Sequence, residues 1–352
     1  PKLAKPEQLP EDIRNSLRLG AYELLLKGTP RHAAIHEWVE ISKARHKKLS
    51  GLINAVLRRL EPPKSLSPAE TYSIPYWLYQ DWENLFASEA EAIAKAMNEP
   101  EPLWLYAYKP EAYKTLEAEG CKLSQGPTEK NLAVQAPLAL HQLEAFKQGL
   151  VGPQNPSSSL IPPLLDIQPG DTVLDLASGN GIKTAQVISL GAKVIAVELS
   201  AKKVKRAEDN LARLGYSADH IVHNLETPPA TEAAAKVLLD APCSGTGTLR
   251  GHPEIKLRLT PEDVRTLARV QRKLLETAWS LTQPGGILIY AICALTTPES
   301  VQTIKQFLEM NADARVIETD VPVSAITTPY GSFILPLKGL DGFFFCKLKK
   351  ST

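Results

Sequence analysis

The sequence has few sulfur-containing residues and no long apolar run. Four of its 352 residues are Cys and two are Met, and the cysteines are too few and too scattered for a disulfide framework. No apolar segment approaches the ~18–20 residues of a membrane span, and none resembles a cleavable signal peptide. Hydrophobic residues at 43% and charged residues at 22% are ordinary for globular proteins, which excludes disorder throughout the chain. We therefore expect a reduced, cytoplasmic protein.

Acidic and basic residues almost cancel, but they are unevenly spread. The net charge of the whole chain is +1, yet residues 1–60 carry 12 Lys and Arg against 6 Asp and Glu, whereas residues 61–150 carry 7 against 13. The positive excess at the front suits a polyanionic partner. A solvated helix face would give the same excess, so charge alone does not decide between the two interpretations.

Hydrophobic spacing divides the chain into three parts. Residues 1–62 carry apolar residues at helical spacing in three successive segments, which predicts a small all-helical module. Residues 63–150 begin with a proline-rich stretch that we interpret as a linker, and their later helix and strand patterns indicate a small α+β domain. Residues 151–352 form the third part. Because the chain starts at Pro1 rather than at a methionine, we expect that an upstream segment is missing.

The third part contains short, continuously apolar segments that alternate with helical ones. Such segments are typical of strands buried on both faces of a parallel sheet. The last two are separated by only a few residues and predict an antiparallel hairpin that closes the sheet. The predicted fold class is therefore α/β, with a Rossmann-like sheet. The candidate parallel strands lie within residues 171–177, 193–199, 236–242 and 285–293, and the hairpin within residues 332–349.

A glycine turn follows the first of these strands, and an acidic residue ends the second. Gly179 and Gly181 allow a ligand to approach the backbone closely, just before a helix N-terminus. Glu198 lies 17 residues after Gly181, which suits an acid that binds ribose hydroxyls. The third glycine of a dinucleotide fingerprint is missing, so a nucleoside without a pyrophosphate fits better, and S-adenosylmethionine is the common one. A merely tight structural turn is the alternative interpretation.

Two of the four cysteines lie at strand ends. Cys243 comes three residues after Asp240 at the end of one strand, and Cys293 ends a later strand. Because ligands bind beyond the carboxyl ends of parallel strands, both thiols can face one pocket. A thiolate that adds to C6 of a pyrimidine enables C5 to attack an electrophilic methyl group, and a base must then remove the C5 proton. Asp240 is placed to hold the N3/N4 edge of the ring. Cys121 and Cys346 are interpreted as core residues.

At these residues the sequence resembles a known family. Asp240–Lys256, DAPCSGTGTLRGHPEIK, is similar to the characteristic motif of the RNA cytosine-C5 methyltransferases of the Sun/RsmB/Nop family. Gln271–Leu275, Pro284–Gly286 and Asp341–Phe344 also look like that family. Residues 17–60 resemble the NusB-like RNA-binding module of the RsmB-type members, without its first helices. Together these matches cover most of the chain.

The resemblance implies a role for each matching residue. Cys293 would be the nucleophile, Cys243 would assist release of the methylated base, and Asp240 would contact the cytosine and the methionine end of the cofactor. Lys183 matches the lysine that ends the family's glycine turn, and we assign it to catalysis and, with Asp240, to cofactor binding. Glu198 would hold the cofactor ribose. The remaining implied cofactor-binding residues are Asp175, Ala177, Ser178, Gly179, Asn180, Gly181, Asn224 and Pro242. The candidate RNA-binding residues are a basic cluster between the second and third predicted helices (Lys43, Arg45, Lys47 and Lys48) together with Arg250.

Several positions depart from the family's usual pattern. The turn has Ala-Ser-Gly-Asn-Gly-Ile-Lys-Thr in place of Cys/Ala-Ala-Pro-Gly-Gly-Lys-Thr. Around the nucleophile, the usual Ser-Thr-Cys-Ser is replaced by Ala291-Ile292-Cys293-Ala294, so three neighbouring hydroxyls are lost. The spacing to the following Pro-Glu pair is one residue longer. Asn155 and Asn224 stand where aspartates are usual.

These patterns together predict an S-adenosylmethionine-dependent enzyme that methylates C5 of a cytosine in small-subunit (16S) rRNA through a covalent Cys–C6 intermediate. The same chemistry on tRNA is one alternative, against which the rRNA-associated helical module argues. A catalytically weakened RNA-binding or ribosome-assembly factor is another, but retention of both cysteines, Asp240 and Lys183 favours an enzyme. DNA methylation by Cys243 would leave Cys293 unexplained. We expect rRNA as the partner, no metal and no membrane, and a monomeric protein.

Overall fold

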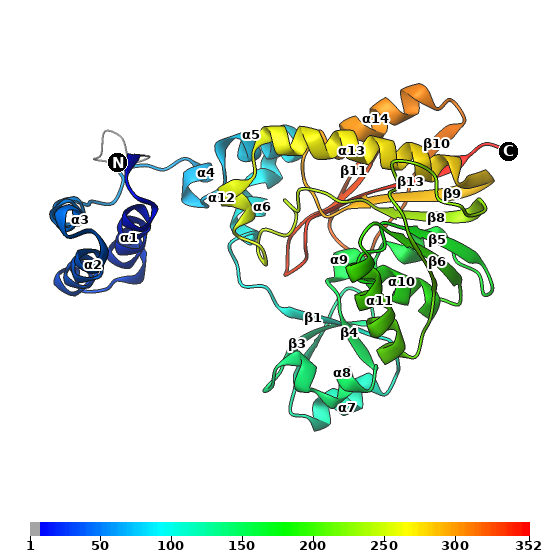
Figure 1. The fold of residues 1–352 in the computed structure, drawn as a ribbon, viewed down its shortest axis with the longest axis horizontal. Coiled ribbons are helices and arrows are strands. Elements are labelled where there is room, and N and C mark those ends of the chain that lie inside the picture. Colours follow the sequence, from blue (N-terminus) through cyan, green and yellow to red (C-terminus); the bar gives the residue numbers. More distant parts are fainter. Residues whose placement is uncertain (1–7) are drawn as a thin grey trace. The chain divides into compact units, whose positions relative to one another are not determined.

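The computed structural model describes residues 8–352, and the chain divides after Ser67 into two units (Figure 1). The first unit is all-helical, as predicted, and is built around Ile13, Ile35, Ile53 and Leu57. Its elements are α1 (Glu11–Tyr22), a π-helical segment (Glu23–Lys27), α2 (Arg31–His46), a 3₁₀ turn (Lys47–Leu49) and α3 (Ser50–Arg58).

The larger unit begins with helices that cover one face of its main sheet. These are α4 (Pro68–Thr71), α5 (Tyr76–Phe86) and α6 (Ala90–Ala96), with a 3₁₀ turn (Ala87–Glu89) between the last two. Trp82 is fully buried, and the ring of Phe86 packs edge-on against Phe333, with 5.0 Å between their centroids. The sequence pattern grouped these helices with the small α+β domain. Their apolar faces belong instead to the core of the main sheet, where they pack on the same face as α13 (Pro261–Ser280) and α14 (Val301–Met310).

A four-stranded antiparallel sheet follows these helices, in the order β2-β3-β1-β4. With its two helices it forms a ferredoxin-like β-α-β-β-α-β unit. One face packs on α7 through Leu105, Leu132 and Val134. The elements are β1 (Leu103–Ala107), α7 (Ala112–Ala118), β2 (Lys122–Gln125), β3 (Asn131–Gln135), a 3₁₀ turn (Leu140–Gln142), α8 (Glu144–Lys147) and β4 (Val151–Pro153). The last strand therefore reaches three residues past the predicted boundary at residue 150.

The main sheet has the order β11-β12-β13-β9-β8-β5-β6-β7, with β10 paired to β13. Strands β5 to β9 pair in parallel, and the C-terminal strand β13 pairs antiparallel with β12 and β9, so both the predicted parallel sheet and the predicted hairpin are confirmed. The bounds are β5 (Thr172–Leu176), β6 (Lys193–Glu198), β7 (Asp219–Val222), β8 (Ala234–Asp240), β9 (Thr282–Ile292), β10 (Ala314–Ile317), β11 (Ala325–Thr328), β12 (Gly331–Ile334) and β13 (Phe343–Lys350).

Helices cover both faces of this sheet, which makes the fold a doubly wound α/β sandwich (Figure 1). The strand order reverses between β5 and β8, and ligands of such sheets bind beyond the carboxyl ends of the strands at that point. The helical elements are α9 (Pro156–Ser159), a 3₁₀ turn (Pro162–Leu165), α10 (Ile182–Ser189), α11 (Ala201–Leu214), α12 (Ile255–Arg258), α13 (Pro261–Ser280) and α14 (Val301–Met310). Within residues 8–352, no helix combines the length and apolarity of a membrane span.

Candidate active site

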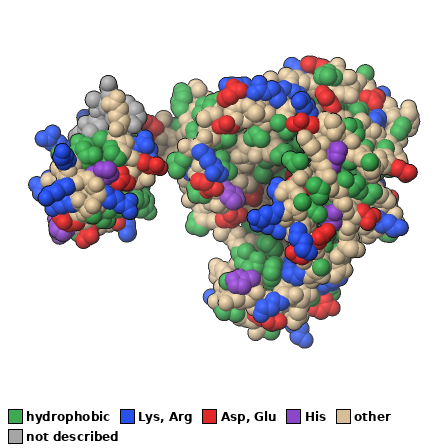
Figure 2. Space-filling model, viewed as in Figure 1, with side chains coloured by type: hydrophobic (Ala, Val, Ile, Leu, Met, Phe, Trp, Pro, Cys, Tyr) green, Lys and Arg blue, Asp and Glu red, His purple; other side chains and the backbone are tan. Residues whose placement is uncertain are grey.

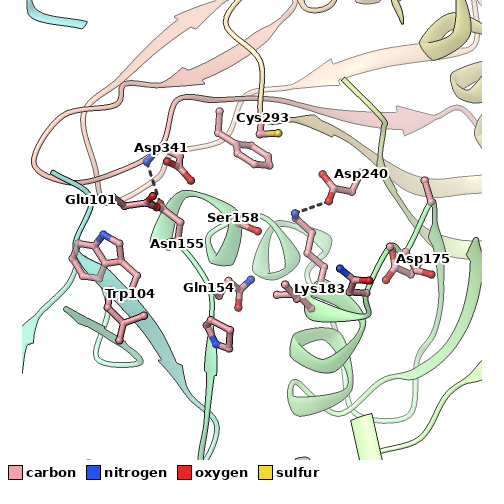
Figure 3. A pocket seen from close by; sticks show the side chains of 18 of the residues that line it. Glu101, Trp104, Gln154, Asn155, Ser158, Asp175, Lys183, Asp240, Cys293 and Asp341 are labelled. Atoms are coloured by element: carbon pink, nitrogen blue, oxygen red, sulfur yellow. Dashed lines mark hydrogen bonds and ion pairs between the residues drawn. The ribbon is translucent and has the colours of Figure 1, made fainter. Parts of the chain in front are cut away.

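A cavity of about 690 Å³ lies at the reversal point of the strand order (Figure 3). The carboxyl ends of β5, β8 and β9 form one side, and β1, β4 and the chain before β13 form the other. Eight residues predicted from the sequence line it: Asp175, Ala177, Ser178, Gly179, Asn180, Lys183, Asp240 and Cys293. The sheet topology therefore brings the proposed cofactor turn and the proposed nucleophile into one space.

The glycine turn is held in place by Glu198, the acidic residue that ends β6. Glu198 is buried and accepts hydrogen bonds from the Gly179 amide at 3.0 Å and from the Ser200 amide at 2.9 Å. Gly181 has a φ of +76°, and a Cβ there would lie 2.9 Å from the Cβ of Ala207 on α11. A side chain at this position would thus push α10 and α11 apart, so the second glycine serves helix packing.

Three buried polar atoms from residues that line the cavity lack hydrogen-bond partners in the described part of the chain. They are Asp175 Oδ1, Ser178 Oγ and Gln154 Oε1. Burial raises the pKa of Asp175 to about 7, although the Thr184 hydroxyl donates to its other oxygen at 2.5 Å. Buried polar groups are normally satisfied. Unsatisfied atoms that converge on one cavity therefore fit a polar ligand with donors of its own, such as the amino acid and nucleoside parts of S-adenosylmethionine.

Lys183 links the glycine turn to the end of β8. Its Nζ lies 2.7 Å from Asp240 Oδ2 and 5.1 Å from the ring centroid of Phe343 (Figure 3). The Lys183 side chain is almost fully buried, whereas that of Asp240 is about one-third exposed toward the cavity. The ion pair thus holds the Asp240 carboxylate in a defined orientation and leaves its other oxygen available to a substrate.

The two strand-end thiols meet at the wall of the same cavity. Cys243 Sγ lies 3.3 Å from Cys293 Sγ, and Cys293 lines the cavity whereas Cys243 does not. The neighbouring Cys293 sulfur and burial together raise the pKa of the Cys243 thiol well above its usual range. Cys243 therefore keeps its proton, and its S–H is within hydrogen-bonding distance of the Cys293 sulfur. Cys121 and Cys346 are free and buried, as the sequence predicted.

One buried carboxylate joins the two loops that carry these cysteines. Glu299 accepts hydrogen bonds from the amide and hydroxyl of Ser244 at 2.8 and 2.5 Å, from Thr296 Oγ1 at 2.7 Å and from Gln271 Nε2 at 3.0 Å. Sequence analysis noted this glutamate only through its spacing to the nucleophile. A lone acid between Pro and Ser carries no further signal, because its partners come from three separate segments.

The C-terminal strand region and the small sheet supply walls that the sequence did not predict. Trp104 of β1 donates through Nε1 to the Gly339 carbonyl at 2.8 Å, and Asn155 Oδ1 accepts from the Asp341 amide at 3.1 Å (Figure 3). Burial and the charge of Glu101 raise the pKa of Asp341 to about 7. These residues complete the cavity opposite the glycine turn.

One predicted RNA-binding residue is wrong. Arg250 is buried and donates to three backbone carbonyls, those of Ala96 at 2.9 and 3.0 Å, Leu340 at 2.9 Å and Pro336 at 3.0 Å. Its guanidinium therefore ties the end of α6 to the segment before β13 and does not face an RNA ligand.

Other predicted cofactor residues lie outside the lining of the cavity. Asn224 is exposed, and its Oδ1 accepts from the Glu226 amide at 3.1 Å. Pro242 is exposed, and its carbonyl accepts from Gln271 Nε2 at 2.9 Å. Glu198 acts on the turn from outside the lining, as described above. Their contacts to a cofactor remain predictions.

The predicted basic cluster (Lys43, Arg45, Lys47 and Lys48) lies at the end of α2 and in the turn that follows it. All four side chains are exposed, and Lys43 pairs with Glu40 at 2.5 Å. Figure 2 shows Lys and Arg side chains on the visible face of this unit, interspersed with acidic ones. Among the described residues, no group of three or more His, Cys, Asp and Glu side chains is arranged to hold a metal ion.

Comparison with known proteins identifies the family. The family described as 16S rRNA methyltransferase RsmB/F matches residues 162–349, and the NusB family matches residues 3–62. The chain belongs to the RsmB/F methyltransferase family. It is therefore an S-adenosylmethionine-dependent RNA methyltransferase with a NusB-type module at its front, as its motifs predicted.

Individual relatives cover nearly the whole chain. The ribosomal RNA small subunit methyltransferase B of Thermus thermophilus is 38% identical over 99% of this chain and 83% of its own length, and that of Vibrio cholerae is 33% identical over 94% and 80%. The crystal structure of PH0851 superposes with a TM-score of 0.82 at 25% identity, covering 98% of this chain and 84% of that one. NSun6 from Pyrococcus horikoshii, solved with SFG, shares the fold with a TM-score of 0.70 at 20% identity over 79% of this chain and 98% of its own.

Proposed function

We propose that the protein transfers a methyl group from S-adenosylmethionine to C5 of a cytosine in small-subunit rRNA, with Cys293 as the covalent nucleophile. The observation that carries this proposal is the position of Cys293 in the wall of the cavity that also contains the glycine turn and Asp240. The proposed nucleophile Cys293, the carboxylate of Asp240 that would bind the cytosine, and the glycine turn that would bind the cofactor thus line one cavity. The rRNA substrate is supported by the family and by the names of the relatives.

The bound cofactor supplies an electrophilic methyl group, and the protein must make C5 nucleophilic. Attack of the Cys293 thiolate on C6 forms a carbon–sulfur bond and moves electron density to C5, which then takes the methyl group. Asp240, oriented by Lys183, holds the N3/N4 edge of the cytosine. Loss of the C5 proton lets the C6–S bond break and returns Cys293 to its thiolate.

Release of the product is assigned to Cys243. Its sulfur lies 3.3 Å from Cys293 Sγ, so it reaches the region where the covalent bond forms and breaks. To act as the base, Cys243 first gives up its own proton to solvent; because its thiol has a raised pKa, the resulting thiolate is a strong base, and it takes the C5 proton to become a thiol again. Before attack, the same S–H can stabilise the Cys293 thiolate by donating to it.

The test is methyl transfer from labelled cofactor to rRNA that lacks the modification, followed by mapping of the modified base. The full chain should give 5-methylcytosine at one position, and Cys293→Ala should abolish transfer while cofactor binding persists. Cys121→Ala removes another buried thiol and serves as the matched control. Methylation of a different atom, or full activity of Cys293→Ala, would refute the covalent mechanism. Binding of rRNA without any transfer would favour the weakened assembly factor, and transfer to tRNA alone would favour the other alternative.

A further inference from the structure

The loop that carries the nucleophile is hydrogen-bonded to a helix outside the sheet. Residues 293–300 connect β9 to α14, and the residues that flank Cys293, namely Ile292 and Ala294, offer no side-chain donor or acceptor. Helix α5 supplies the missing contacts. Asp81 Oδ2 accepts from the Thr297 amide at 2.8 Å, and Asp81 Oδ1 accepts from the Thr297 hydroxyl at 2.6 Å.

Trp82, the next residue of α5, adds a third contact to the same loop. Its Nε1 donates to the Leu295 carbonyl at 2.8 Å, and its indole is fully buried. The backbone amide of Leu295 itself donates to Thr246 Oγ1 at 2.9 Å. The backbone two and four residues after Cys293 is thus held by α5, whereas Glu299 and Thr246 join the loop to the segment that carries Cys243.

We propose that Asp81 is a positioning residue for the methyl-transfer reaction, which fixes the Cys293 sulfur beside Cys243 and Asp240 by anchoring Thr297. This inference rests on the proposed function of Cys293. Bonds from amide and hydroxyl groups to a carboxylate are stronger than neutral ones, and two of them on one residue fix both its position and its rotation. The Asp81 pair therefore anchors a loop in which Ile292 and Ala294, the residues next to the nucleophile, have no hydrogen-bonding side chains.

The effect should appear in turnover more than in substrate binding. A misplacement of about 1 Å at a reacting atom can cost ~100-fold in rate, whereas Asp81 lies outside the lining of the catalytic cavity. We expect Asp81→Ala to lower kcat about 10- to 100-fold and to leave KM for RNA and for the cofactor within about twofold. Asp81→Asn, which retains an acceptor for the Thr297 amide, should recover most of the lost rate.

A matched control separates positioning from general destabilisation. Glu119 likewise accepts two amide hydrogen bonds, from Glu144 at 2.6 Å and Ala145 at 3.1 Å, but it lies beside α8 in the small sheet unit. Glu119→Ala should lower the melting temperature without a selective loss of kcat. Equal loss of kcat in Asp81→Ala and Glu119→Ala, or wild-type kcat in Asp81→Ala, would overturn the proposal.

A second readout needs neither RNA nor cofactor. Alkylation of the folded protein by iodoacetamide, quantified by peptide mass spectrometry, gives the labelling rate of Cys293 relative to Cys243. This ratio should change severalfold in Asp81→Ala and stay unchanged in Glu119→Ala. An unchanged ratio in Asp81→Ala would overturn the positioning role even if the chain proved to methylate nothing. Thr297→Val removes one of the two contacts, and it decides the question by the same ratio if Asp81→Ala does not fold.

Discussion

Cys243 Sγ and Cys293 Sγ lie 3.3 Å apart although 50 residues separate them in the chain. The two thiols meet because β8 and β9 are parallel neighbours, so their carboxyl ends reach the same edge of the sheet. The adjacent sulfur and burial raise the pKa of Cys243, so this residue keeps its own proton. Of the two residues, Cys293 thus lines the cavity, whereas Cys243 lies next to it but outside the lining.

Because the two sulfurs occupy different positions, we expect their alanine variants to stop at different steps of the reaction. Cys243→Ala should methylate its RNA and then stall, because the C5 proton is no longer removed efficiently and Cys293 stays bonded to C6. Denaturing gel electrophoresis with labelled RNA should show a stable adduct that carries one transferred methyl group. The double variant should show none. An adduct with Cys293→Ala and none with Cys243→Ala would reverse the assignment.

Replacement of Glu198 should weaken cofactor binding for two reasons. Its carboxylate is the proposed ribose ligand, and it also accepts the Gly179 amide that shapes the turn. We expect Glu198→Ala to lose about 1–3 kcal/mol of binding free energy, measured by titration calorimetry with S-adenosylmethionine. Glu208→Ala, an exposed carboxylate on α11, is the control. An unchanged dissociation constant for Glu198→Ala would place the ribose elsewhere.

The basic cluster of the front unit should contribute to RNA affinity at any sequence. Neutralising Lys43, Arg45, Lys47 and Lys48 together should lower the slope of log Kobs against log salt by a few units, because each phosphate contact releases condensed counterions. Lys43 should contribute least, since it already pairs with Glu40. The double change of Arg18 and Lys27 to Gln, at exposed positions outside the cluster, is the control. A slope equal to that of the wild type would mean that the cluster is a solvated helix face.

Arg250 should matter for stability and not for RNA affinity. Arg250→Ala leaves three buried carbonyls without their donor, which should cost at least about 3 kcal/mol of unfolding free energy. Urea unfolding followed by tryptophan fluorescence measures this loss. In the fraction that remains folded, the salt dependence of RNA binding should equal that of the wild type. A reduced salt slope with unchanged stability would restore Arg250 as a phosphate ligand.

The raised pKa of Asp175 makes stability fall with increasing pH. The folded carboxyl titrates near 7 and the unfolded one near 3.8, so the folded state binds more protons between these values. The free energy of unfolding should therefore decrease as pH rises toward 7 and level off above it. Asp175→Asn keeps an acceptor for Thr184 but cannot ionise. Its stability relative to the wild type should rise between about pH 4 and pH 7 in urea titrations, and a constant difference would contradict the assignment.

The sequence predicted those parts of the fold that depend on local patterns. Continuous apolar segments identified the parallel strands, and an acid or cysteine at their ends marked the edge where the cavity lies. The three helices of the front unit followed from periodicity in the same way. The Asp240 motif added the chemistry, because its residue types and spacing are specific to one family.

Contacts between distant segments could not be predicted in this way. Arg250 binds carbonyls 154, 86 and 90 residues away, so its own neighbourhood in the sequence gives no sign of burial. Helix α5 follows a proline-rich stretch, and its apolar face does not reveal which sheet it covers. The contact of Asp81 with Thr297 spans 216 residues. Trp104 and Asp341 also reach the cavity only through the tertiary fold.

The contacts of α5 and α6 also locate the boundary at which this protein can be recombined. A cut near Ser67 falls between the two units, so a front module can be exchanged there while the larger unit keeps its core. A cut at residue 150 would remove Trp82, Phe86 and Asp81 and leave the nucleophile loop without its contacts to α5. The compact unit that contains the methyltransferase sheet therefore begins at about residue 68, well before Thr172, where the first strand of that sheet starts.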